Sequence, residues 1–267
     1  MATIKVNGVE LYYERHGTGD PVVLVHGGFV DGDSWAFLVP ELTDHHEVIV
    51  YDHRGHSRSE RPPGELSSLD ELVDDLAALI EALDIAPAHV VGLSMGGTVA
   101  LRLAAKAPDL VRALSVHEPG AFALLVDVPE AKTHHDYVVE TLEEILRTAG
   151  TDPLEAMRGF TDRILPGAWD LIPDNMRAQM ADNATYYGTP DLDVDLDALG
   201  RYTGPVLLTM GDATPSDFGW AHMMPILERS MKDTRLVTIA GAGHGPAFTH
   251  AAEYGALLRT FFAETTS

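Results

Sequence analysis

One serine lies among glycines in the stretch 92–97, Gly-Leu-Ser-Met-Gly-Gly, directly after an apolar run and before a helix-forming segment. A sharp turn from strand to helix crowds its central residue, and glycines two positions on either side of Ser94 remove side chains that would clash. Such a turn lifts the Ser94 hydroxyl to a helix N-terminus, where the Met95 N–H and the helix dipole face a developing oxyanion. The stretch therefore predicts a nucleophile elbow that attacks carbonyl carbon.

The elements that would position this serine alternate along the chain. Uninterrupted apolar runs predict strands buried on both faces, and they cover residues 21–25, 48–51, 90–93, 113–116, 206–210 and 236–239. Helical patterns separate them, most clearly over 69–83, where Ser68 and Glu71 form a capping box. Asn7-Gly8 predicts a hairpin turn. This alternation predicts an α/β fold with a parallel sheet and right-handed crossovers.

One long interval lacks a strand pattern. Residues 119–204 carry helical patterns only, at 134–148, 153–165 and 175–187. The interval is far longer than the usual connection of about 2–6 residues. We therefore expect a core formed by residues 1–119 and 205–267, with residues 120–204 as a helical cap over one end of the sheet.

At this point the sequence resembles the α/β-hydrolase family, in four places and in the same order. These are the His-Gly-Gly-Phe at 26–29, with Asp31 and Trp35 following, the segment 51–59, the elbow at 92–97, and the Gly-Ala-Gly-His-Gly at 241–245. Ser57 departs slightly, because the family often has glycine there. The resemblance implies an eight-stranded, mostly parallel sheet flanked by helices, with the cap inserted between strands six and seven.

The resemblance also implies roles for particular residues. The oxyanion hole would be formed by two backbone N–H groups, those of Gly28 and Met95. His244 follows a buried strand, lies between glycines and comes late in the chain, in the order nucleophile, acid, histidine that suits this fold. It would act as the general base that takes the Ser94 proton and returns it to the leaving group. His26 would brace its loop rather than react.

The family pattern does not directly identify the acid that orients His244, because Thr214 stands where the family usually has aspartate. Glu118 is the first carboxylate after the run at 113–116, and some relatives resemble that arrangement, with a glutamate after strand six. We favour Glu118 over Asp212, with Asp217 as a third candidate.

A serine nucleophile restricts the reaction, since it attacks a carbonyl and forms an acyl-enzyme. We expect a carboxylic ester hydrolase that cleaves an ester or lactone. The same family includes carbon–carbon bond hydrolases and cofactor-free haloperoxidases, which are the alternatives among enzymes, and it includes ligand-binding proteins, which are the alternative outside them. The expected substrate is an apolar, mid-sized small molecule bound by Phe29, Trp169 and Tyr187. Other candidate lining residues are Phe122, Leu124, Leu125, Met157, Phe160 and Tyr186.

The composition excludes several other classes. The formal net charge of −23 over 267 residues repels phosphate backbones, so we expect no nucleic-acid partner. No apolar stretch is long enough to span a membrane, the N-terminus lacks a signal-peptide pattern, and there are no cysteines for disulfides or thiolate metal sites. We expect a cytoplasmic monomer or homodimer that needs no metal and no organic cofactor.

Overall fold

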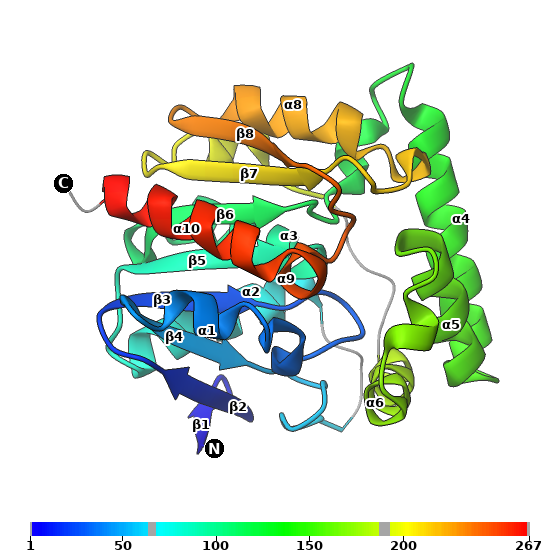
Figure 1. Ribbon diagram of the computed structural model, residues 1–267, viewed down its shortest axis with the longest axis horizontal. Coiled ribbons are helices and arrows are strands. Elements are labelled where there is room, and N and C mark those ends of the chain that lie inside the picture. Colours follow the sequence, from blue (N-terminus) through cyan, green and yellow to red (C-terminus); the bar gives the residue numbers. More distant parts are fainter. Residues whose placement is uncertain (1, 64–67, 187–192, 266–267) are drawn as a thin grey trace.

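The computed structural model describes residues 2–63, 68–186 and 193–265. Its centre is one eight-stranded sheet in the order β1-β2-β4-β3-β5-β6-β7-β8 (Figure 1). Only the pairings β1–β2 and β2–β4 are antiparallel, so the predicted mostly parallel sheet is confirmed. The strands are β1 Ala2–Val6, β2 Val9–His16, β3 Asp20–Val25, β4 His46–Tyr51, β5 Ala88–Leu93, β6 Val111–His117, β7 Val206–Gly211 and β8 Thr234–Ile239.

Local sequence explains where two of these elements begin. Asn7 and Gly8 both have positive φ, 45° and 85°, so they form the tight turn that pairs β1 with β2. The Ser68 hydroxyl accepts from the Glu71 N–H, and the Glu71 carboxylate accepts from the Ser68 N–H. This is the predicted capping box, and it starts α2 (Leu69–Ala82).

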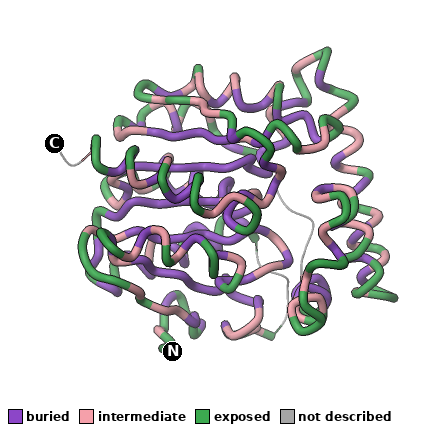
Figure 2. The backbone as a smooth tube through the Cα atoms, viewed as in Figure 1, coloured by how far each residue is buried: buried purple, intermediate pink, exposed green. Residues whose placement is uncertain are grey.

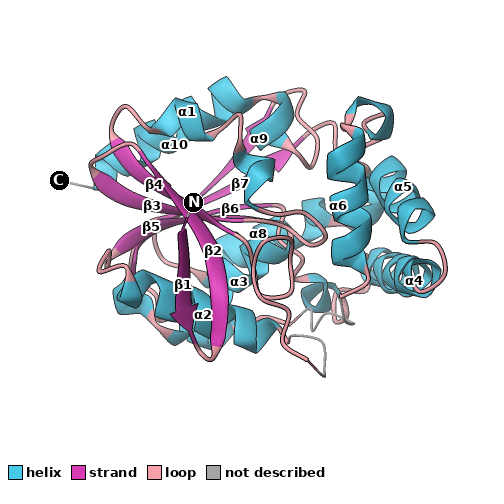
Figure 3. Ribbon diagram, turned by 90° about the horizontal axis from the view of Figure 1, so that it is seen from below, coloured by secondary structure: helices cyan, strands magenta, loops and turns pink. Residues whose placement is uncertain are grey.

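Helices cover both faces of the sheet (Figure 3). One face packs against α1 Val39–Leu42 and α10 Ala251–Thr265. The opposite face packs against α2 Leu69–Ala82, α3 Met95–Lys106 and α8 Trp220–Ser230. The central strands β3, β4, β5, β6 and β7 are mostly buried between these layers (Figure 2), whereas the edge strands β1 and β8 are more exposed. Two shorter helices are α7 Leu196–Leu199 and α9 Pro246–Thr249.

The connection from β6 to β7 contains three longer helices, α4 Lys132–Ala149, α5 Pro153–Ile164 and α6 Asp174–Ala184. They stand together beyond the carboxyl ends of the strands, as the predicted cap (Figure 1). Their apolar sides form a small core with Phe29, which comes from the loop after β3. In the part of the chain that the structure describes, no helix is both long and apolar enough to cross a membrane.

Buried histidines make the stability of this fold depend on pH. His56, His89 and His117 are almost wholly buried, and burial lowers the pKa of each to about 4. The unfolded chain then binds more protons than the folded chain between the folded pKa, about 4, and the unfolded one, about 6.5. Stability should therefore fall as the pH is lowered through this interval.

His89 offers a direct test, because its ring stacks on Phe262 at 4.3 Å and neither ring nitrogen has a hydrogen-bond partner among the described residues. Replacing His89 with Phe keeps the stacking and removes the titrating group. We expect the fall in Tm between pH 7 and pH 5 to become smaller in this variant than in the wild type. Replacing the exposed His45 with Gln is the control, and an equal change in both variants would contradict the prediction.

Candidate active site

Ser94 lies at the turn between β5 and α3 in a conformation that few residues adopt. Its φ is 54° and its ψ is −122°. A side chain on Gly92 would come within 2.4 Å of the Gly96 carbonyl oxygen, and one on Gly96 within 2.2 Å of the Val25 carbonyl oxygen. Only glycine fits at these two positions, so the strand–turn–helix arrangement expected from the sequence is present.

Two segments that carry the predicted oxyanion donors border Ser94. Met95 is the first residue of α3, in the turn that carries the positive end of the helix dipole. Gly28 lines the same pocket as Ser94, from the loop after β3. The neighbouring Gly27 approaches so closely that an added Cβ would lie 3.4 Å from the Ser94 Cβ. Both predicted oxyanion donors therefore come from segments that border the serine.

The loop that carries Gly28 is braced by two buried histidines. His26 Nδ1 bonds the Gly27 carbonyl at 2.8 Å, and His26 Nε2 accepts from the His53 N–H at 3.0 Å. The His53 ring in turn bonds the His26 carbonyl at 3.1 Å. Burial lowers the pKa of both rings well below the usual value, which keeps them neutral. His26 thus ties the loop after β3 to the loop after β4.

Glu118 and His244 form a buried pair. Nδ1 of His244 lies 2.8 Å from Glu118 Oε2. The other carboxylate oxygen, Oε1, accepts from the Gly211 N–H at 2.9 Å and from the Thr214 hydroxyl at 2.7 Å. Glu118 follows β6, and its φ of 41° is uncommon for a non-glycine residue. The carboxylate is therefore held from both sides in one orientation, with one oxygen assigned to the histidine.

These contacts determine the charge of Glu118. Burial acts to raise its pKa, because a charged carboxylate loses its hydration. The hydrogen bond from His244, the nearby His117 and the Gly211 N–H act in the opposite direction and prevail, so the pKa of Glu118 lies below its usual value. An ionised carboxylate at this place fixes the Nδ1–H tautomer of His244 and leaves Nε2 as the basic nitrogen.

The other two candidate acids have different partners. Asp212 Oδ1 accepts from the Gly241 N–H at 2.6 Å, at the surface. Asp217 is exposed, and its backbone carbonyl contacts His134. Thr214, which stands at the position usual for aspartate, instead donates to Glu118. Of the three carboxylates weighed from the sequence, the structure brings Glu118 to His244.

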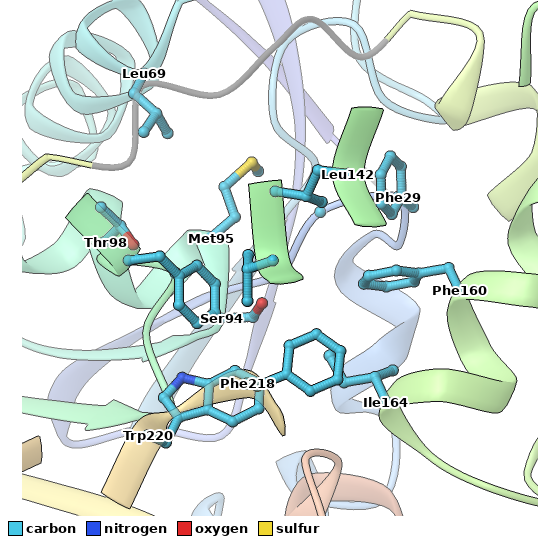
Figure 4. A pocket seen from close by; sticks show the side chains of 14 residues that line it. Phe29, Leu69, Ser94, Met95, Thr98, Leu142, Phe160, Ile164, Phe218 and Trp220 are labelled. Carbon is cyan, nitrogen blue, oxygen red and sulfur yellow. The ribbon is translucent and has the colours of Figure 1, made fainter. Parts of the chain in front are cut away.

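Trp220 connects the histidine to the pocket of the serine. Its ring stacks on His244, with centroids 4.7 Å apart and planes inclined by 23°. Its indole Nε1–H donates to the Pro119 carbonyl at 2.9 Å, which fixes the ring. Trp220 and Ser94 both line one pocket (Figure 4). The ends of β5, β6 and β8 therefore place Ser94, Glu118 and His244 around the same end of the sheet.

The pocket above Ser94 is small and almost wholly apolar. It holds about 50 Å³, between the elbow and helices α4 and α5 of the cap. Among the described residues its lining has no charged side chain, and it consists of Gly28, Phe29, Leu69, Ser94, Met95, Thr98, Gly120, Phe122, Val138, Leu142, Phe160, Ile164, Phe218 and Trp220. Thr98 is notable because its buried hydroxyl has no hydrogen-bond partner in the described part of the chain.

The aromatic residues expected to line the pocket lie in different places. Phe29, Phe122 and Phe160 line it, whereas Trp169 does not. Trp169 follows α5 and is buried within the cap, with the Arg177 guanidinium 5.2 Å from its ring centre. A helical pattern identifies a buried residue but not which neighbour it packs against, so Trp169 could not be assigned to the cap interior from the sequence. Tyr187 lies outside the described residues.

Sequence reasoning did not identify Thr214, Gly211 and Trp220 as parts of the site. Thr214 stands where the family usually has an acid, and the signal that could have identified it is its hydroxyl, which can donate to a carboxylate at the end of the neighbouring strand. Trp220 belongs to no sequence motif. It contacts His244 because the strands that precede the two residues, β7 and β8, are neighbours in the sheet.

His117, Glu118 and His244 also satisfy the spacing of a metal site, with one possible ligand atom from each within 4.8 Å of the others. The oxygens of Glu118, however, already accept from His244, Gly211 and Thr214. A cation would have to displace these donors. The donors around Glu118 therefore favour a hydrogen-bonded pair of Glu118 and His244 over a metal site.

Comparisons with known proteins identify the family of the chain. The chain is 38% identical to a putative carbamate hydrolase, RutD, of Azorhizobium caulinodans over 107 residues, which is 40% of each chain. A thermophilic esterase from Thermogutta terrifontis matches over 99% of this chain and 97% of its own, with TM-score 0.77 and 26% identity. A bromoperoxidase from Bacillus anthracis matches over 98% and 99%, with TM-score 0.77 and 25% identity. Since a sequence model of the alpha/beta hydrolase fold matches residues 20–251, the chain belongs to the alpha/beta hydrolase family.

Proposed function

We propose that this protein hydrolyses an uncharged carboxylic ester or lactone through an acyl-enzyme on Ser94. The observation that carries the proposal is the buried bond between Glu118 and His244, at the same end of the sheet as the strained turn that presents Ser94. The names of similar proteins differ, from carbamate hydrolase to bromoperoxidase and esterase, and the chain spans about 40% of the length of that carbamate hydrolase. The proposal therefore rests on the site.

The reaction proceeds in two steps. His244 Nε2 takes the proton of the Ser94 hydroxyl as Oγ attacks the carbonyl carbon, and the Gly28 and Met95 N–H groups stabilise the oxyanion. The tetrahedral species collapses, the bond to the leaving oxygen breaks, and His244 returns the proton to that oxygen. Water then attacks the acyl group by the same route and releases the acid. Throughout, Glu118 stays ionised and holds the Nδ1–H of His244.

The pocket supports a short, apolar and uncharged acyl group. A space of about 50 Å³ bounded by Phe29, Phe122 and Phe160 fits a short chain, and the described residues that line it include no cation to pair with a carboxylate. A charged group there would lose its hydration without gaining a partner. We propose that residues 120–204 act as a cap that selects the substrate, because α4 and α5 supply Val138, Leu142, Phe160 and Ile164 to this lining.

Replacing Ser94 with Ala should lower the turnover of p-nitrophenyl butyrate by at least about 10³-fold. A fluorophosphonate probe should label the wild-type protein at Ser94 and leave the variant unlabelled, as read by peptide mass spectrometry. A wild-type protein that folds but neither turns over esters nor accepts the probe would show that the fold serves ligand binding instead.

Replacing Glu118 with Gln removes the charge that stabilises the His244 cation, and can present an amide N–H to Nδ1. We expect kcat to fall by up to about 10⁴-fold. Asp212→Asn is the matched control, since it alters an aspartate that contacts only loop backbone in the described structure, and kcat should stay within about threefold of the wild type. A crippled Asp212→Asn beside an active Glu118→Gln would reverse the assignment.

The apolar lining should disfavour substrates whose acyl group carries a charge. We expect kcat/KM for p-nitrophenyl butyrate to exceed that for p-nitrophenyl hemisuccinate, which has an acyl chain of the same length, by at least about 100-fold. Leu142→Lys places a cation on the cap side of the pocket, where it can pair with the hemisuccinate carboxylate. This variant should lower the ratio of kcat/KM for the butyrate to kcat/KM for the hemisuccinate. Equal rates for the two esters in the wild type would show that the acyl group binds elsewhere.

A further inference from the structure

A single amide in the cap joins two loops of the core. Asn183, near the end of α6, is wholly buried. Its Nδ2 donates to the Phe29 carbonyl at 3.1 Å and lies 3.3 Å from the Val30 carbonyl, in the loop after β3. Its Oδ1 accepts from the Ser57 N–H at 2.8 Å, in the loop after β4. The side chain thus binds both loops that border the elbow.

The partners of Asn183 fix which way its amide faces. An amide turned by 180° would set its oxygen against two carbonyls and its NH2 group against an N–H. Ser57 adds a second link, because its hydroxyl donates to Asp31 Oδ2 at 2.7 Å and accepts from Asn183 Nδ2 at 3.1 Å. Ser57 has a φ of 45°, a conformation that favours glycine. The serine that supplies this hydroxyl therefore occupies a position where glycine would fit the backbone better.

These bonds act on the residue next to Gly28. Phe29 has a φ of 67°, so its peptide groups depend on outside contacts to keep their orientation. Its ring packs edge-on against Phe160 of α5 at 5.1 Å, and its carbonyl accepts from Asn183 of α6. The cap therefore holds Phe29 by both its side chain and its backbone, one residue after the proposed oxyanion donor.

We propose that Asn183 is a positioning residue, which couples the seating of the cap to the placement of the Gly28 N–H in the oxyanion hole. This inference rests on the proposed function, because it concerns a donor used in acyl transfer. A donor displaced by a fraction of an ångström stabilises the oxyanion less, while the apolar pocket still binds the substrate. Loss of Asn183 should thus lower kcat more than it changes KM.

Other contacts seat α6 without touching the loop after β3. Arg61 pairs with Asp182 at 2.7 Å, and the Tyr186 hydroxyl donates to the Pro62 carbonyl at 2.9 Å. These contacts keep the cap in place when Asn183 is changed. Arg61 Nη2, which pairs with Asp182, also donates to Asn183 Oδ1 at 3.4 Å. Asp182→Asn is a matched control, because it weakens the attachment of α6 and replaces none of the groups that bond Asn183 in Phe29 and Ser57.

The test compares p-nitrophenyl butyrate with its thiono analogue, in which sulfur replaces the carbonyl oxygen. Sulfur is a poor hydrogen-bond acceptor, so the preference for the oxygen ester measures the oxyanion hole. In Asn183→Ala we expect kcat for the oxygen ester to fall about 10- to 100-fold with KM within about threefold, and the oxygen-to-sulfur ratio of kcat/KM to fall about tenfold. Asp182→Asn should keep the wild-type ratio.

Asn183→Asp provides a second variant if the alanine variant does not fold, since it keeps the size and the acceptor for the Ser57 N–H but loses the donor to Phe29. A folded variant with the wild-type kcat and ratio, or one in which both esters slow equally, would overturn the role of Asn183. A wild-type protein that cleaves neither ester and is not labelled at Ser94 would overturn the proposed function instead.

Discussion

The hydrogen bond between His244 Nδ1 and Glu118 Oε2 is the contact on which the rest of the site depends. A buried carboxylate is stable only when donors replace its lost hydration, and here Gly211, Thr214 and His244 supply them. Gly211 is the last residue of β7, Thr214 follows β7, and His244 follows β8. The bond thus requires β6, β7 and β8 to lie side by side, as the sheet order provides.

The same end of the sheet concentrates unusual backbone conformations. Ser94 after β5 and Glu118 after β6 both have positive φ, 54° and 41°. Conformations of this kind each cost about 1–3 kcal/mol and persist where the surroundings determine them. The Ser94 N–H donates to the His117 carbonyl at 3.0 Å, so the two turns support each other directly. We infer that the strain is maintained because it directs the two side chains.

Much of this architecture was predictable from the sequence, because the controlling signals are local. The apolar runs and the capping box at Ser68 determine elements within a few residues, and the glycines around Ser94 reveal a turn that only small residues permit. Glu118 could be favoured because Thr214 removed the usual alternative. The position of Trp169 and the bonds of Asn183 were not predictable. Asn183 and Ser57 are separated by 126 positions, and no periodic pattern reports a contact of that range.

The most direct test of this account is the proton NMR signal of the His244 Nδ1–H. A proton shared with an ionised carboxylate in a buried site resonates far downfield and exchanges slowly. If this signal is absent from the spectrum of His244→Gln, it can be assigned to His244. We expect the signal in the wild type and in Asp212→Asn, and its loss in Glu118→Gln. A signal that survives in Glu118→Gln and disappears in Asp212→Asn would contradict the pairing on which the mechanism is built.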